Sequence, residues 1–337
     1  MSDVSVPLRE APLRSSVSLV QRLTGSQAFW ITLALLLICI GMAMAPAAIS
    51  GPFTSYNNVF NISRNFAFIA IMALGQTAVI ITGGIDLSVG SIMGVVGIVL
   101  GLMMDAGHGF IVSTITALLV ALACGAINGY LIAYLKLSPF VVTLGMLSIA
   151  RSTALVVSNN RMVYQFGPDE QILLELGGGS LWGVPNAVWA ALILTVIFGF
   201  MLRYTLWGRH VFAIGGNEQA ARLTGIAVNR VKLSVYLVCA FTTGIATILM
   251  VGWLGSVTNA LGVGTELRVI AASVIGGANL VGGEGGAYGA LIGAALIEVI
   301  RNSLLLAGVD PYWQGMFVGL FIILAVLLEK FRGRRSA

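Results

Sequence analysis

Asp86 lies in the stretch GGIDLSVGS, residues 83–91, where paired glycines and a serine interrupt two long apolar runs. Two adjacent glycines permit backbone angles that other residues avoid. The side chains of Asp86 and Ser88 can accept hydrogen bonds from the free N–H groups that begin a helix, where a carboxylate also meets a favourable partial charge. The stretch therefore predicts a helix that breaks at the glycines and restarts behind a polar cap.

A similar pattern occurs in GGANLVGGE, residues 276–284. Paired glycines again precede a short polar side chain, Asn279, and a leucine. Because asparagine is uncharged, the recurrence indicates that the residue type serves the geometry of the break and does not require a negative charge. We expect one local device used twice.

Glu298 is the acidic residue placed most clearly inside an apolar run, and Arg301 and Asn302 follow it at three and four residues. These spacings bring side chains to one face of a helix. An unpaired charge in a bilayer interior costs about 2.5–3.5 kcal/mol even on a lenient scale, so an ion pair is expected. The partner is Arg301 or, alternatively, Arg151; a proton relay for ion coupling is a third interpretation.

Other chemistry has little support in the sequence. A phosphate-binding loop needs a lysine directly after a glycine, and none of the lysines follows a glycine. The 2 histidines and 3 cysteines lie apart, without the spacing of a metal or catalytic cluster. The sequence therefore predicts no catalytic site, no metal, no cofactor of its own and no ATPase activity.

The elements that carry these residues are predicted from composition. With 58% hydrophobic and 9% charged residues among 337, against about 25% charged in a soluble domain, we expect an all-α integral membrane protein. A helical span needs about 20 apolar residues, which predicts about ten spans; nine or eleven stay open because the eighth is short and broken by glycines. The expected spans cover residues 28–49, 60–82, 87–104, 110–135, 138–157, 187–205, 232–253, 267–281, 286–305 and 312–329.

Basic residues predict how these spans are oriented. Most of the 18 lie in segments that share one side if the N-terminus is cytoplasmic and the number of spans is even, which is the asymmetry of inner-membrane proteins. Both termini are then cytoplasmic, and the net charge of +5 gives no support to nucleic-acid binding. The expected parts are a tail at 1–27, a single membrane domain at 28–330 and a basic tail at 331–337, with an outer loop at 158–186 and an inner loop at 206–230.

The inner loop contains GGNEQAARLTGI, residues 215–226. Asn217 can cap a helix, Glu218 suits its positive end, and Gly225 can terminate it. A short helix over residues 219–224 is therefore expected at the inner membrane surface. It lacks the apolar face of a membrane anchor, and its shape suits insertion into a groove of a soluble partner.

The pattern E-x-A-A-x-x-x-G, from Glu218 to Gly225, resembles the coupling helix of ABC importer permeases. The stretches GGIDLSVGS, FAIGGNEQAARLTGI and VIGGANLVGGEGGAYGALIGA, in that order, are similar to the ribose, xylose and arabinose branch of that superfamily. The resemblance covers about residues 28–330. Gln219 departs from the family pattern, which has alanine at that position.

The resemblance implies a ten-span permease subunit of the second structural type of ABC importer, in a bacterial inner membrane. It implies three kinds of partner: a second permease copy or paralogue, cytoplasmic ABC ATPase subunits that bind the ATP, and a periplasmic sugar-binding protein. The implied cargo is a small sugar or polyol, with a derivative resembling autoinducer-2 as an alternative. An ion-coupled secondary transporter of a small polar solute is the alternative function.

Three groups of candidate site residues follow. Polar residues within or beside the spans are expected to line the transport path, although hydrogen bonds between helices explain them equally well. The path candidates are Gln76, Asp86, Ser88, Asn128, Thr143, Arg151, Asn279, Glu298, Arg301 and Asn302. The candidates for ATPase coupling are Arg209, Asn217, Glu218 and Arg222, and those for docking the binding protein are Arg64 and Arg161.

Overall fold

The computed structural model describes residues 27–313, 315–317, 319–320 and 323. Its long helices are α2 (Gln27–Ala43), α4 (Tyr56–Ile81), α5 (Val89–Asp105), α6 (Phe110–Ala133), α7 (Pro139–Val157), α9 (Asn186–Tyr204), α12 (Val228–Leu254) and α14 (Ala287–Leu306), and the shorter α13 (Thr265–Ile275) lies between the last two in the chain. The shorter elements are α3 (Ala47–Thr54), η1 (Gly167–Asp169), α8 (Glu170–Gly178), α10 (Leu206–Gly216), α11 (Glu218–Leu223), η2 (Pro311–Trp313) and a hairpin of β1 (Ser180–Leu181) with β2 (Val184–Pro185). The expected tails, and much of the expected tenth span, lie outside the described residues.

Six of these helices are long and apolar enough to span a membrane, namely α4, α6, α7, α9, α12 and α14. Helices α2 and α5, with 17 residues each, are slightly shorter. The 11 residues of α13 rise about 16 Å, against about 30 Å of bilayer core. The expected eighth span, 267–281, is therefore wrong as one helix, because α13 ends at Ile275, just before the paired glycines.

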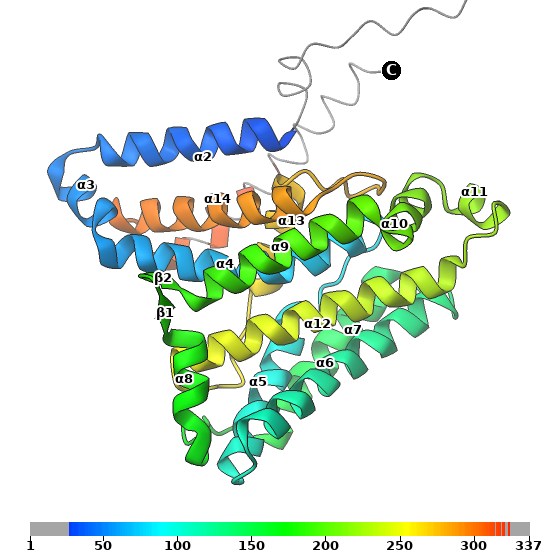
Figure 1. The fold of residues 1–337 in the computed structure, drawn as a ribbon, viewed down its shortest axis with the longest axis horizontal. Helices are drawn as coiled ribbons and strands as arrows, with labels where there is room; N and C mark the ends of the chain where they lie inside the picture. Colours follow the sequence, from blue (N-terminus) through cyan, green and yellow to red (C-terminus); the bar gives the residue numbers. More distant parts are fainter. Residues whose placement is uncertain (1–26, 314, 318, 321–322, 324–337) are drawn as a thin grey trace, which may run out of the picture.

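A break at Pro46 divides the first expected span, 28–49. Helix α2 ends at Ala43, Pro46 is the N-cap residue of α3, and Pro52 lies inside α3. Proline lacks an N–H and clashes with the preceding turn of a helix. A single helix across 28–49 was thus a wrong prediction, and the chain turns between α2 and α4 (Figure 1).

The connections between successive long helices gather alternately at two ends of the molecule (Figure 1). At one end, near α10 and α11, the ammonium of Lys136 after α6 donates to the side-chain oxygen of Asn229 in the first turn of α12, at 2.7 Å. At the opposite end, near α8, the N–H of Phe110 at the start of α6 donates to the carboxylate of Asp169, at 2.8 Å. Successive long helices therefore run in opposite directions, as consecutive membrane crossings do.

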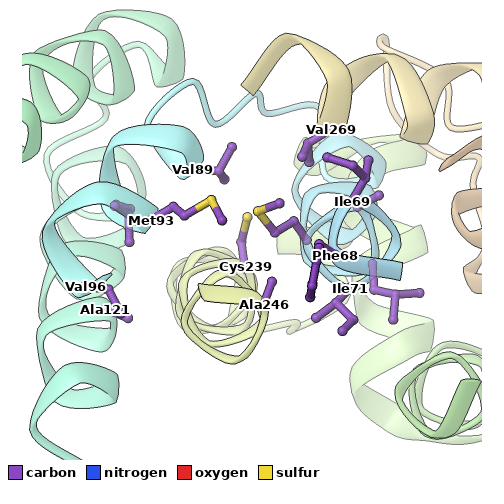
Figure 2. Packing of buried hydrophobic residues seen from close by; sticks show 14 of the residues in the cluster. Phe68, Ile69, Ile71, Val89, Met93, Val96, Ala121, Cys239, Ala246 and Val269 are labelled. Atoms are coloured by element: carbon purple, nitrogen blue, oxygen red, sulfur yellow. The ribbon is translucent and has the colours of Figure 1, made fainter. Parts of the chain in front are cut away.

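The core lies where α4, α5, α12 and α13 meet. Figure 2 shows Phe68 of α4, Met93 of α5, Cys239 of α12 and Val269 of α13 directed into one cluster, and all four are buried. Small residues let helices approach closely in lipid: a Cβ added to Gly75 would lie 2.5 Å from the Cα of Cys239. Helices α4 and α12 thus meet at backbone distance, which fixes the position of the segment that follows α4.

Both polar segments expected as loops contain further helices. The outer one includes α8, which lies against α12 because Gly177 and Gly252 leave room for the facing backbones. The inner one includes α10, which was not predicted. Its buried residues Val211 and Ile214 stand three apart, a helical spacing that could have indicated it.

Candidate functional site

Asp86 lies in the connection between α4 and α5 and is fully buried. Its Oδ1 accepts hydrogen bonds from the backbone N–H of Ser88 at 2.8 Å and from the Ser88 hydroxyl at 2.5 Å. That hydroxyl oxygen accepts in turn from the side-chain amide of Asn128 in α6, at 2.9 Å. The carboxylate therefore closes a turn ahead of α5. The prediction that Asp86 or Ser88 caps the N–H groups of α5 itself was wrong, because neither side chain accepts a hydrogen bond from that helix.

Gln76 and Thr143 join the same buried cluster from α4 and α7. With its amide oriented to satisfy both partners, Gln76 donates to the carbonyl oxygen of Asp86 at 3.2 Å and accepts from its N–H at 3.1 Å. The Thr143 hydroxyl lies 3.3 Å from the carbonyl oxygen of Ile85. Five of the ten predicted path residues thus form one network, which we call the Asp86 cluster: Gln76, Asp86, Ser88, Asn128 and Thr143.

The Asp86 cluster keeps unused hydrogen-bonding capacity. Among the described residues, Oδ2 of Asp86, Oδ1 of Asn128 and the hydroxyl of Tyr236 are buried without a hydrogen-bond partner. Tyr236 was not predicted; a Cβ added to Gly84 would lie 2.7 Å from its hydroxyl oxygen. It is a polar residue inside an expected span, the signal that identified Gln76 and Asn128. A polar solute that reached this cluster would therefore meet free acceptors and a hydroxyl.

Asn279 forms the same turn as Asp86. Its Oδ1 accepts from the backbone N–H of Val281 two residues later, at 2.8 Å, as Asp86 does from Ser88. The expectation of one local device used twice is confirmed by this geometry. Asn279 is partly exposed where Asp86 is buried, and an uncharged amide suffices there.

Glu298 and Arg301 form the expected ion pair within α14. The Arg301 Nε donates to Oε2 of Glu298 at 2.9 Å, and Nη2 contacts Oε1. Asn302 exchanges hydrogen bonds with Asn58 at the start of α4. Arg151, the alternative partner, instead donates from Nη1 to two carbonyl oxygens in the α12–α13 connection, those of residues 259 and 261, at 2.6 and 3.0 Å.

Helix α11 is the expected short helix, displaced by one residue. The side chain of Asn217 accepts from the N–H of Ala220 at 2.9 Å, and Gly225 follows the helix at φ 85°. Asn217 is thus the predicted cap. Leu223, at the end of α11, is 89% exposed.

Glu218 anchors α11 to the start of α12. Its Oε1 is 3.0 Å from Nη2 of Arg222, and its Oε2 is 2.5 Å from Nζ of Lys232. Partial burial acts to raise the pKa of the Glu218 carboxyl, but the hydrogen bond and charge of Lys232, the hydrogen bond of Arg222 and the charge of Lys136 outweigh it and lower that pKa. Lys232 was not predicted as a site residue, because only the tertiary fold brings it to Glu218.

The remaining predicted residues differ in how accessible they are. The guanidinium of Arg64 lies 4.4 Å from the ring centroid of Trp253 and donates to Asn61 at 2.6 Å. Arg161, near α8, and Arg209, on α10, are exposed. Arg161 is therefore open to a partner at its end of the molecule, whereas Arg64 is held by its neighbours.

Comparisons with known proteins agree with this architecture. The family model described as branched-chain amino acid transport system / permease component matches residues 58–326. The chain is 38% identical over 296 residues to the ribose import permease protein RbsC of Escherichia coli (strain K12), covering 88% of this chain and 91% of that protein. It is 34% identical over 307 residues to the fructose import permease protein FrcC of Rhizobium meliloti, covering 89% and 84%.

The third relative is the L-arabinose ABC transporter permease protein AraH of Azospirillum brasilense, 32% identical over 280 residues, with 83% of this chain and 82% of that protein covered. No solved structure matches the chain significantly. The family model and these relatives each cover most of the sequence. The chain therefore belongs to the branched-chain amino acid transport system / permease component family and is a permease subunit of the ABC importer type.

Proposed function

We propose that this chain forms the translocation pathway of an ABC importer for a small sugar or polyol, delivered by a periplasmic binding protein and driven by cytoplasmic ATPase subunits. The printed names of three relatives specify ribose, fructose and L-arabinose. The shared chemistry of these cargoes is a small polyhydroxylated ring, so we assign that class to this chain.

The observation that carries the proposal is helix α11. It is capped by Asn217, joined to α12 through Glu218 and Lys232, and presents Leu223 outward. A short helix fixed at its base, with one large apolar side chain exposed, suits a groove on a soluble ATPase. Arg209 on the neighbouring α10 and Arg222 on α11 itself are exposed and supply charge for the same contact with the ATPase.

The connections between helices, which alternate between the two ends of the molecule, support a ten-span arrangement with both termini in the cytoplasm. The described helices α2, α4, α5, α6, α7, α9, α12 and α14, with the short α13 between the last two, succeed one another, and the expected tenth span, 312–329, lies largely outside the described residues. Lys136, Arg209, Arg222 and Lys232 share the end with α10 and α11, which the positive-inside rule places in the cytoplasm of a bacterial inner membrane. The 28–330 segment is then a single domain between two cytoplasmic tails.

The path itself is proposed to pass the Asp86 cluster. The other candidates are Asn279 in the α13–α14 connection, Arg151 on α7 against the α12–α13 connection, and Glu298, Arg301 and Asn302 on α14. The unsatisfied oxygens of Asp86 and Asn128 suit passing contacts with sugar hydroxyls. No cofactor is assigned to this chain, because the ATP is bound by the partners. At the outer end, Arg161 is proposed to contact acidic residues of the binding protein, and Arg64 contributes only if Trp253 releases it.

Docking of the ATPase can be tested with Leu223→Asp. This side chain is exposed, so folding should change little, while a buried charge at the interface should abolish co-purification of the ATPase subunit. Leu181→Asp, at an exposed leucine of the opposite end, is the matched control and should leave co-purification intact. Normal ATPase binding by Leu223→Asp would remove α11 from the proposed interface.

A further inference from the structure

The C-terminal turn of α10 sits directly on two other backbone segments. Gly215 is the next-to-last residue of α10, and a Cβ added to it would overlap the carbonyl oxygen of Ile81 and the amide nitrogen of Gly283. The N–H of Gly283 donates to that same Ile81 carbonyl, at 2.9 Å. Three segments far apart in the sequence therefore share one contact, which we call the glycine joint: Ile81, Gly215 and Gly283.

Each segment of the glycine joint leads to a feature already described. Beyond Gly215, α10 ends at Gly216 and Asn217 caps the start of α11. Ile81 is the last residue of α4, five residues before Asp86, and Gly283 lies four residues after Asn279 in the α13–α14 connection. In Figure 1 that connection reaches the end of the molecule where α10 and α11 lie. The glycine joint thus connects the short helix α11 with the two turns that Asp86 and Asn279 form.

The glycine joint is a backbone contact, and both of its glycines lie outside the fully buried core. Gly215 is only partly buried, so its close approach is not explained by filling the core. The touching groups are backbone atoms, which cannot rotate away as the end of a side chain can. Close-packed backbones pass a displacement on to one another.

We infer that the glycine joint positions the Asp86 turn relative to α11 and that Gly215 is a positioning residue for ATP-driven transport. The inference rests on the proposed function, because it assigns the route by which movement of α11 reaches the Asp86 cluster. When a docked ATPase displaces α10 and α11, the end of α4 and the α13–α14 connection move with them. The Asp86 turn then opens or closes in step with ATP hydrolysis.

The neighbouring glycine provides a matched control. A Cβ added to Gly216 meets nothing within 4 Å, and neither Gly215 nor Gly216 has a positive φ, so alanine is conformationally acceptable at both. In proteoliposomes holding the full complex, Gly215→Ala should keep basal ATP hydrolysis while ATP-driven uptake of labelled pentose falls about ten-fold or more. Gly216→Ala should stay within about two-fold of the unaltered chain in both measurements.

Three outcomes would overturn the inference: normal uptake by Gly215→Ala, equal loss in both variants, or loss of basal hydrolysis together with uptake, which would mean that Gly215 only holds the docking helix. If the unaltered complex itself shows no ATP-driven uptake, the proposed function fails instead. The two failures are therefore distinguishable.

A second measurement does not depend on the folding of Gly215→Ala. Val281, two residues before Gly283, is 86% exposed, and an environment-sensitive fluorophore can be attached to Val281→Cys, with the chain lacking the added cysteine as background. Docking of the ATPase subunit should change the emission from this position in the chain that retains Gly215. Unchanged emission on docking would show that the joint passes no movement on.

Discussion

At the scale of single residues, Asp86 serves geometry more than charge. Its Oδ1 accepts both hydrogen bonds from Ser88, and asparagine offers the same oxygen. Among the described residues, the titratable groups found to interact electrostatically with it are Tyr236, Cys124 and Cys239, and none of them is a cation. Its counterpart Asn279 forms the turn without charge.

Asp86→Asn should therefore retain most uptake, whereas Asp86→Leu should not. Leucine leaves the buried N–H and hydroxyl of Ser88 without their acceptor, at a cost of about 1–3 kcal/mol for each unsatisfied group. Thermal unfolding and ATP-driven uptake of the two purified variants provide the comparison. Equal loss in both would show that the negative charge itself is required.

Lys232 sets the pH range in which Glu218 holds α11. Because the folded pKa of Glu218 is lowered, the stability it contributes is present above its unfolded pKa and is lost as pH falls through the folded value. Lys232→Ala should raise that folded pKa, so ATPase binding should weaken at a higher pH than in the unaltered chain. The contribution is modest, about 0.2–1 kcal/mol, for a partly exposed pair.

A pH series of ATPase binding, with Lys232→Arg as the charge-preserving control, measures this shift. The control should follow the unaltered chain closely. Identical curves for Lys232→Ala and the control would mean that the ion pair does not fix α11.

At the scale of elements, helices whose ends are set by neighbouring residues were predicted well, and helices that depend on tertiary contacts were not. Helix α11 was predicted to within one residue because its cap, Asn217, and its terminating Gly225 act within a few residues. The first and eighth spans failed for a different reason: the break at Pro46 divides the first, and the glycines after Ile275 end the eighth early, although hydropathy alone continues across both. Helix α8 was missed because its polar segment is held by α12, which no local pattern reveals.

The candidate site shows the same division. The types and depths of Gln76, Asn128 and Thr143 marked them as polar within apolar runs, yet their meeting with Asp86 depends on the packing of four helices. The contact of Lys232 with Glu218 and the glycine joint could not be predicted for the same reason, because the residues that meet lie on different elements. Pairing within one helix, as between Glu298 and Arg301, could be predicted from spacing alone.

The contact of α8 with α12 can be tested with two adjacent glycines. A Cβ on Gly177 would overlap the carbonyl oxygen of Leu249, whereas one on Gly178 meets its nearest neighbour at 3.7 Å, an ordinary contact. Gly177→Ala should therefore destabilise the protein by about 1–3 kcal/mol, and Gly178→Ala should be close to neutral. Thermal unfolding in detergent measures both; equal stability would mean that α8 does not rest on α12.

At the scale of the whole molecule, the fold places the two proposed docking surfaces at opposite ends. The end with α10 and α11 carries Glu218, Arg222, Lys136 and Lys232, and the end with α8 carries exposed Arg161. The Asp86 cluster follows α4 in the α4–α5 connection and is buried where α4, α5, α6 and α7 meet. This arrangement suits a transport path to which a binding protein delivers the sugar on one side and an ATPase docks on the other.

ATP-driven uptake in proteoliposomes tests this account most directly. The proteoliposomes hold complexes of the chain with its ATPase, and sugar-binding protein loaded with labelled pentose is added on the opposite side of the membrane from the ATPase. They should accumulate the pentose only when ATP is present on the ATPase side. Collapse of the proton gradient should not matter, and ATP should still drive uptake by Glu298→Gln, although Arg301 loses its partner. Uptake by the chain alone, driven by an imposed proton gradient and abolished in Glu298→Gln, would contradict the account.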